Sequence, residues 1–268
     1  MANPSILRYP GGKTRAAKLI ADMVPETTEN IVSPFFGGGS FEFHWARANP
    51  EGRVIAADLF YPVANFWQQV KRNPAAVADA VKNYYPLSKD EFYALQQRHL
   101  HTTDPVIAAA QFYVLNRASF SGSTLSGGMS PGHARFNEAS ITRLRDFTMD
   151  NVDVDNNSIF TWLRRGPLRR KHVRQDNTVI YLDPPYWINN DNLYGHKGST
   201  HKQFDHKRLY ALLNLLTEHG WTWILSYNNS DDVKKLYREY PYIEPQWAYG
   251  MSKDKSAKEI IITSGELT

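Results

Sequence analysis

Cysteine is absent from the 268 residues of this sequence. Its absence excludes disulfide bonds, thiolate metal ligands and any catalytic mechanism that depends on a cysteine nucleophile. Apolar runs of the roughly 18 residues needed to span a membrane are absent as well. Residues 1–8 lack the apolar core of a signal peptide. We therefore expect a cytoplasmic protein that is not embedded in a membrane.

Neither sign of charge is in large excess, because 31 lysines and arginines stand against 27 acidic residues, for a net charge of +4. This mildly basic balance permits a nucleic-acid partner without establishing one. Apolar residues make up 42% of the chain and charged residues 22%, as in a globular protein with a buried core. The length fits one large α/β domain, with or without an insertion.

Five apolar runs are typical of β-strands, and helical patterns separate several of them. The runs cover residues 30–35, 53–59, 177–183, 221–227 and 259–264. Helical patterns cover residues 41–48 and 205–220. Alternation of this kind predicts an α/β fold, with a mostly parallel sheet covered by helices on both faces.

The region from residue 74 to residue 147 interrupts this alternation. It contains helical patterns, including a capping box formed by Ser88 and Glu91, but no convincing strand. Residues 120–136 are rich in glycine and serine, which indicates a loop. Long loops within compact domains are usually functional or disordered. We therefore predict a helical insertion that carries a long loop.

The segment SPFFGGGSFEF follows one predicted strand and opens a predicted helix. Its glycines, residues 37–39, allow a tight turn and a close approach to a ligand. Asp58 ends the next predicted strand, where an acid can accept hydrogen bonds from ribose hydroxyls. Together the two features predict a site for a nucleoside-containing cofactor. The turn carries little positive charge, which favours a cofactor without a pyrophosphate.

The segment RYPGGKTR, residues 8–15, has some similarity to a phosphate-binding loop because Gly12, Lys13 and Thr14 are consecutive. That loop requires another glycine five positions before Gly12, where this sequence has Leu7. No strand is predicted before the segment either. The sequence therefore argues against an ATP-hydrolysing enzyme.

The stretch VIYLDPPYWIN is an apolar strand that ends at Asp183 and two prolines. The prolines fix their own φ angles, restrict the residues before them and donate no hydrogen bond. The segment therefore offers two rigid acceptors, the Asp183 carboxylate and the Pro184 carbonyl, beside the flat ring of Tyr186. This arrangement suits an aromatic amine such as that of adenine or cytosine.

Together these segments resemble the DNA-adenine N6-methyltransferases of the Dam type, with their motifs in the alpha order. The resemblance rests on the segments RYPGGK, PFFGGGS, LNRASFSG, RFN, DPPY and FDH, and it extends over nearly the whole chain. It implies a Rossmann-like S-adenosylmethionine-dependent methyltransferase sheet in a catalytic domain formed by residues 1–72 and 148–268. Residues 73–147 would be a helical insertion that recognises the DNA target.

The resemblance also implies roles for individual residues. S-adenosylmethionine would be bound by Tyr9, Pro10, Gly11, Gly12, Lys13, Phe35, Gly37, Gly39, Ser40, Asp58, Leu59, Ser158, Ile159 and Asp183. The catalytic motif would be Asp183, Pro184, Pro185 and Tyr186. DNA would be contacted by Arg117, Ser121, Arg135, Tyr194 and Lys197. Two positions depart from the family's pattern, because many relatives have aspartate in place of Ser158 and an acid in place of Ser33.

The implied reaction transfers a methyl group from S-adenosylmethionine to N6 of an adenine that is flipped out of double-stranded DNA and stacked on Tyr186. Hydrogen bonds from the amine to Asp183 and Pro184 would localise the nitrogen lone pair and stabilise the developing positive charge. Neither a covalent intermediate nor a metal ion is expected, which agrees with the lack of cysteine. A restriction endonuclease is a candidate partner.

Two alternatives remain open from the sequence. Methylation at N4 of cytosine uses the same clamp chemistry, although the aspartate at position 183 favours adenine because the cytosine enzymes more often have serine there. A catalytically silent DNA-binding protein could keep the same fold, although the complete set of motifs argues against it.

Overall fold

A single mixed sheet organises the computed structural model, which describes residues 5–9, 11–125, 127–130, 135–187, 204–245 and 259–265. Its strand order in this part of the chain is β3-β2-β1-β4-β5-β7-β6. The strands are β1 (Asn30–Ser33), β2 (Arg53–Asp58), β3 (Val152–Asn156), β4 (Thr178–Leu182), β5 (Thr222–Asn228), β6 (Tyr242–Ile243) and β7 (Glu259–Thr263). Strands β1 to β5 are parallel, whereas β7 is antiparallel to β5 and β6.

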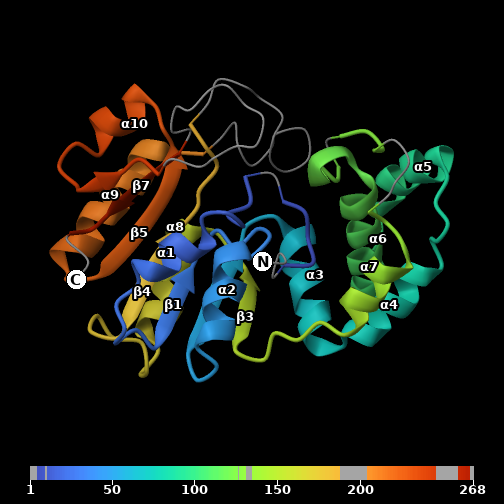
Figure 1. Cartoon of the computed structure of the whole chain (residues 1–268), viewed down its shortest axis with the longest axis horizontal. Helices are drawn as coiled ribbons and strands as arrows, with labels where there is room; N and C mark the ends of the chain where they lie inside the picture. The colour runs from blue at the N-terminus through green and yellow to red at the C-terminus, as the bar shows by residue number, and fades with distance from the viewer. Residues whose placement is uncertain are drawn as a thin grey trace.

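Helices cover both faces of this sheet and extend beyond one of its edges (Figure 1). They are α1 (Ala17–Asp22), α2 (Ser40–Ala48), α3 (Tyr61–Arg72), α4 (Pro74–Lys82), α5 (Lys89–His99), α6 (Pro105–Ala118), α7 (Glu138–Arg145), α8 (Ile159–Arg165), α9 (His206–Glu218) and α10 (Asp231–Leu236). Among the helices in the described ranges, none is both long enough and apolar enough to cross a membrane.

The buried strands contribute to a separate hydrophobic core on each face of the sheet, because successive side chains of a strand point to opposite faces. In β4, Val179 and Tyr181 pack in the core that also contains residues of α1, α2 and α3. Ile180 and Leu182 pack in the core that contains residues of α8, α9 and α10. Burial on both faces explains the apolar run from Val179 to Leu182 in β4. The expected α/β fold is therefore confirmed.

Strand β3, at the edge of the sheet beside β2, departs from the sequence-based expectation. Its sequence, VDVDN, contains three polar residues, and only Val152 and Val154 are buried. The strand therefore lacks the apolar run by which the other strands are predicted. Instead, the strand is defined by its parallel pairing with β2, which runs from Val54 opposite Val152 to Asp58 opposite Asn156.

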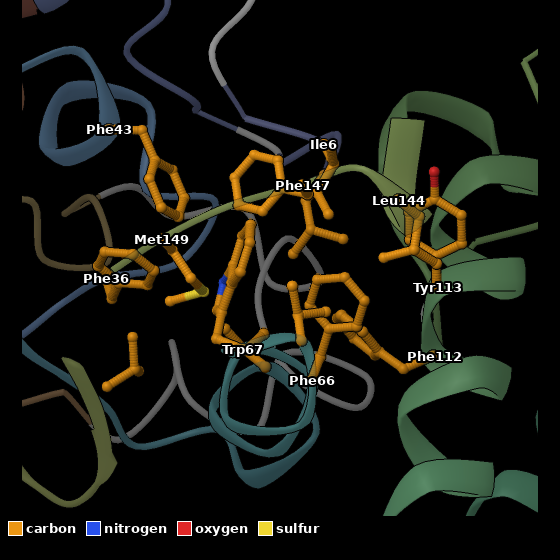
Figure 2. Packing of buried hydrophobic residues seen from close by; sticks show 14 of the residues in the cluster. Ile6, Phe36, Phe43, Phe66, Trp67, Phe112, Tyr113, Leu144, Phe147 and Met149 are labelled. Carbon is orange, nitrogen blue, oxygen red and sulfur yellow. The ribbon is translucent and has the colours of Figure 1, made fainter. Parts of the chain in front are cut away.

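Helices α4 to α7 lie together on the side of α3 that faces away from the sheet (Figure 1). Phe66 and Trp67 of α3 belong to the same core as Phe112 and Tyr113 of α6, as Figure 2 shows. The rings of Phe66 and Tyr113 stack with their centroids 5.7 Å apart. The inserted helices therefore share one continuous core with the sheet. The predicted capping box at the start of α5 is confirmed.

Candidate active site

A cavity of about 330 Å³ lies at the carboxyl ends of β1, β2, β3 and β4. Strand β1 lies between β2 and β4, so the strand order reverses direction at this point of the sheet. Open α/β sheets bind their ligands at such a switch point, because the loops after the strands diverge there. The cavity is therefore the candidate site of the protein.

The turn between β1 and α2 forms part of the cavity wall. Gly37 and Gly39 have φ angles of 49° and 64°, in the left-handed region that favours glycine. A Cβ at Gly37 would lie 2.8 Å from the ring of Tyr9. A Cβ at Gly39 would lie 2.7 Å from the rings of Phe36 and Phe43. Backbone conformation and close packing therefore both require glycine at these two positions.

Asp58 stands at the end of β2 and also lines the cavity. One of its carboxylate oxygens accepts a hydrogen bond from the Gly37 backbone N–H, and the other accepts one from Phe60 N–H, each at 2.8 Å. Burial raises the pKa of this carboxyl to about 6, although the two backbone donors act in the opposite direction. Each carboxylate oxygen can accept a further hydrogen bond. Asp58 can therefore hold the glycine turn and still bind ligand hydroxyls.

Asp183 follows β4 directly and carries a carboxylate that is 23% exposed at the cavity. Lys13 Nζ donates to Asp183 Oδ1 at 2.7 Å and to the carbonyl of Gly11 at 2.9 Å. Burial raises the pKa of Asp183 to about 6, whereas the charge and the hydrogen bond of Lys13 lower it. The carboxyl is therefore mostly ionised at neutral pH.

Glu259, the first residue of β7, completes a group of charged and aromatic side chains around Asp183. It accepts a hydrogen bond from the Tyr186 hydroxyl at 3.0 Å and lies 4.0 Å from Lys13 Nζ. Lys13 Nζ is also 4.9 Å from the centroid of the Tyr186 ring. Burial by itself lowers the pKa of Lys13, but the charges of Asp183 and Glu259 raise it above its ordinary value. Lys13 therefore stays charged between two acids.

Asn228, at the end of β5, fixes the backbone that follows the two prolines. Its side chain accepts a hydrogen bond from Trp187 N–H at 2.8 Å and donates one to the Trp187 carbonyl at 3.0 Å. The Trp187 ring stacks on His206, with centroids 4.9 Å apart and planes at 5°. His206 belongs to the FDH segment, so this segment helps to anchor the Asp-Pro-Pro-Tyr turn.

An aromatic wall forms another part of the cavity. Phe204 contacts Phe35 edge-on, with ring centroids 5.6 Å apart, and stacks on Phe160 with centroids 6.1 Å apart. The guanidinium of Arg208 lies 4.2 Å from the centroid of the Phe160 ring. Ile159, at the start of α8, lines the cavity beside Phe160. This apolar surface suits a flat ring system.

Three arginines come together where the N-terminal segment meets the inserted helices. Arg117 Nε donates to the carbonyl of Arg135 at 3.0 Å, and a terminal guanidinium nitrogen of Arg8 donates to the Ser119 carbonyl at 3.1 Å. Burial lowers the pKa of Arg8, and the charges of Arg135 and Arg117 lower it further. No acidic side chain of the described ranges forms an ion pair with any of the three. They therefore form a positively charged cluster, of which the sequence predicted only Arg117 and Arg135.

The short turn after α6 exposes a large aromatic side chain that the sequence analysis did not single out. Phe120 is 66% exposed, and the neighbouring Ser121, a predicted DNA contact, is also exposed. Ser121 has a φ of 53°, which is unusual for a residue other than glycine. A Cβ at Gly122 would lie 2.2 Å from the carbonyl oxygen of Arg8, so the turn is held against the N-terminal segment.

Most residues predicted to bind the cofactor line this one cavity. The predicted residues in its wall are Tyr9, Gly12, Lys13, Phe35, Gly37, Gly39, Ser40, Asp58, Leu59, Ser158, Ile159, Asp183 and Pro185. Gly11, Pro184 and Tyr186 adjoin these residues in the chain. Pro10, Tyr194 and Lys197 lie outside the described residues. Within the described ranges, no group of three or more histidine and acidic residues is placed to hold a metal ion.

Comparison with known proteins agrees with this geometry. Residues 9–251 match the family of D12 class N6 adenine-specific DNA methyltransferases. Because the match covers most of the chain, the protein belongs to this family. It is therefore an enzyme that transfers a methyl group to N6 of adenine in DNA, and the family decides between adenine and the cytosine alternative.

Curated relatives of similar length support the assignment. The type II methyltransferase M1.LlaDCHI of Lactococcus lactis subsp. cremoris is 24% identical over 96% of this chain and 94% of its own length. The type II methyltransferase M.CviBI of Paramecium bursaria Chlorella virus NC1A is 21% identical over 91% of this chain and 90% of its own. A DNA adenine methylase of Vibrio cholerae is 22% identical over 87% of this chain and 84% of its own.

Proposed function

We propose that the methyl donor is S-adenosylmethionine and that the acceptor is an adenine flipped out of duplex DNA. The observation that carries this proposal is the position of Asp183, which lies in the wall of the same cavity as the glycine turn and Asp58. A donor bound along the turn and an amine bound at Asp183 would meet within one site. Such positioning supplies much of the rate enhancement of a direct transfer.

The cavity fits the chemistry of this donor in two respects. Asp58 has acceptor capacity left for ribose hydroxyls beside the glycine turn. The aromatic wall of Phe35, Phe160 and Phe204 offers an apolar surface to the adenine ring, next to Ile159. When bound, S-adenosylmethionine supplies an electrophilic methyl group on a positively charged sulfur.

The Asp-Pro-Pro-Tyr turn fits the acceptor. The lone pair of adenine N6 is delocalised into the ring, so the amine is a poor nucleophile. Hydrogen bonds to the Asp183 carboxylate and the Pro184 carbonyl would localise the lone pair and stabilise the developing positive charge. Lys13 occupies Oδ1 of Asp183 and leaves Oδ2 for the amine. The face of Tyr186, whose hydroxyl is held by Glu259, would support the flipped base.

We also propose that residues 73–147 recognise the target sequence, whereas residues 1–72 and 148–268 carry catalysis. The positive cluster supports this division because two of its three arginines, Arg117 and Arg135, belong to residues 73–147, and arginine side chains bind phosphates and base edges. Ser121 lies beside the exposed ring of Phe120 at the same junction. Tyr194 and Lys197 remain proposed DNA contacts outside the described residues.

A methyl-transfer assay tests the proposal. The enzyme is incubated with S-adenosylmethionine labelled in its methyl group and with duplex DNA, single-stranded DNA or RNA, and the products are digested to nucleosides. We expect label in N6-methyladenine of duplex DNA, and less than about a tenth as much with the Asp183→Asn variant. Label in N4-methylcytosine, or no transfer from this donor, would overturn the proposal. Because two relatives are named type II methyltransferases, protection of the DNA from restriction enzymes would then identify the target site and a candidate partner endonuclease.

A further inference from the structure

Glu42 is a buried acid in the cavity wall to which neither the sequence analysis nor the proposed mechanism assigns a role. It lies in the first turn of α2, only 2% exposed, and it lines the cavity. Its Oε1 accepts a hydrogen bond from the Ser33 hydroxyl at 2.6 Å, and Ser33 is the last residue of β1. An ionised carboxyl buried at a cavity wall destabilises the fold unless a partner compensates its charge.

The titratable groups around Glu42 come from two segments of the chain, the end of β4 with the turn after it and the N-terminal segment. The negative charge of Asp183 after β4 disfavours its ionisation, and Lys13 before α1 favours it. The Tyr181 hydroxyl of β4 also interacts with Glu42 electrostatically. Burial is the largest influence and raises the pKa of Glu42 to about 8. Lys13 forms its hydrogen bond with Asp183, and no lysine or arginine in the described part of the chain forms an ion pair with Glu42.

We propose that Glu42, held by Ser33, binds the α-ammonium group of the methyl donor. This inference rests on the proposed use of S-adenosylmethionine, which carries two positive charges, one on sulfur and one on the amino group. The ammonium group has three N–H donors, whereas the sulfonium has none. Glu42 has carboxylate acceptor positions beyond the one that Ser33 fills. The sulfonium is required at the Asp183 clamp, so the ammonium group is the charge left for Glu42.

Binding should therefore release a proton near neutral pH. In the empty enzyme Glu42 holds its proton at about pH 7, because its pKa is about 8. The free amino group of the ligand, with a pKa of about 8, is also protonated there. The bound pair, a carboxylate with an ammonium ion, keeps one proton of the two. The other passes to the buffer, so roughly one proton is released for each ligand bound.

Titration calorimetry in two buffers of different ionisation enthalpy measures this release on the full-length enzyme. Three ligands are compared: S-adenosylmethionine, S-adenosylhomocysteine, which keeps the ammonium group but lacks the sulfonium, and methylthioadenosine, which lacks the amino-acid end. We expect proton release with the first two only. Glu42→Gln should abolish the proton release and raise the dissociation constants of S-adenosylmethionine and S-adenosylhomocysteine at least about tenfold. It should leave methylthioadenosine affinity unchanged.

A second test variant and a control accompany Glu42→Gln, so that the proposal can be tested even if Glu42→Gln folds poorly. Ser33→Ala retains the acid but removes its donor, so we expect weaker binding of the two amino-acid-bearing ligands and a larger proton release at slightly alkaline pH. Glu218→Gln, at an exposed position of α9, controls for loss of a negative charge and should change neither quantity.

The outcomes separate this inference from the proposed function. Failure of the wild-type enzyme to bind S-adenosylmethionine would refute the donor assignment. Tight wild-type binding with the same affinity and proton release in Glu42→Gln would refute the role of Glu42 alone. An effect confined to S-adenosylmethionine, absent with S-adenosylhomocysteine, would mean that Glu42 faces the sulfonium, and the ammonium assignment would be wrong.

Discussion

The ammonium group of Lys13 lies 2.7 Å from the carboxylate of Asp183, although 170 positions separate them in the chain. The lysine is only 3% exposed, so it cannot exchange this partner for water. The pair joins the N-terminal RYPGGK segment to the Asp-Pro-Pro-Tyr turn. Lys13 therefore holds Asp183 ionised and directs one of its oxygens, which leaves the other available for the substrate amine.

Replacing Lys13 should change the pH dependence of methylation. Turnover requires ionised Asp183, so wild-type activity should fall as the pH is lowered through about 6, the pKa of this carboxyl. The charge of Lys13 lowers that pKa, so Lys13→Met should move the decline to higher pH and reduce turnover near neutral pH. Lys18→Met removes an exposed lysine of α1 and should leave the profile unchanged. An unshifted profile in Lys13→Met would show that Lys13 does not control Asp183.

Asp183→Asn should lose more than nine-tenths of methyl transfer, because an amide is a weaker acceptor for the amine and cannot offset its growing positive charge. The variant keeps the shape of the side chain, so the fold and most of the donor affinity should remain. Single-turnover rates, together with S-adenosylmethionine binding and thermal unfolding, measure these quantities separately. Retention of more than a tenth of wild-type turnover would remove Asp183 from the catalytic step.

Asp58→Ala should weaken donor binding and also loosen the glycine turn. The carboxylate accepts backbone hydrogen bonds from Gly37 and Phe60, and hydrogen bonds to a charged group are worth roughly 1.5–3 kcal/mol each. We expect about a tenfold or larger rise in the dissociation constant for S-adenosylmethionine, with DNA affinity little changed. Asp153→Ala, which removes an exposed acid of β3, is the matched control. Calorimetry that finds wild-type donor affinity in Asp58→Ala would contradict the assignment.

The stability of the empty enzyme should depend on pH through Glu42. Its pKa is about 8 in the folded state, above the ordinary value of 4.5. The folded protein keeps a proton that the unfolded chain loses, so the free energy of unfolding falls by up to a few kcal/mol between about pH 4.5 and about pH 8. Glu42→Gln should remove this decline. Its Tm relative to wild type should therefore increase as the pH rises, and a constant difference would rule out this titration.

Alanine variants of the three clustered arginines should show whether these residues recognise bases or bind phosphates. If Arg117 or Arg135 reads a base, its alanine variant should relax specificity at one position by roughly 1–3 kcal/mol. If it contacts phosphate, binding should weaken evenly across sequences and the salt dependence should become shallower. The same test applies to Arg8. Arg53→Ala, at the amino end of β2 and so at the edge opposite the cavity, is the control.

Affinities for the cognate duplex and for single-substitution duplexes, at two salt concentrations, separate these outcomes. If no variant of the cluster changed affinity, specificity or salt dependence, the proposed recognition role of residues 73–147 would lose its support. The segment of residues 193–202, which includes Tyr194 and Lys197, would then be the better candidate.

The fold class, the glycine turn and the strand ends that carry Asp58 and Asp183 could be predicted from the sequence, because each depends on local signals. A strand buried on both faces favours apolar residues, as from Val179 to Leu182 of β4, and a left-handed turn position selects glycine, as at Gly37 and Gly39. Asp58 ends β2 and Asp183 follows β4, so the parallel sheet brings both to one edge. Strand β3 was not predictable in this way, since pairing with β2 rather than an apolar run defines it.

The pairing of charged side chains could not be predicted from the sequence. Glu259 and Lys13 lie at opposite ends of the chain, and the antiparallel addition of β7 beside β5 brings the acid next to Tyr186. Glu42, in the first turn of α2, forms a hydrogen bond with Ser33 at the end of β1, nine positions earlier in the chain. No local pattern encodes these distances. Electrostatic interactions depend on separation and burial in space, and both are defined only once the sheet and its helices have packed.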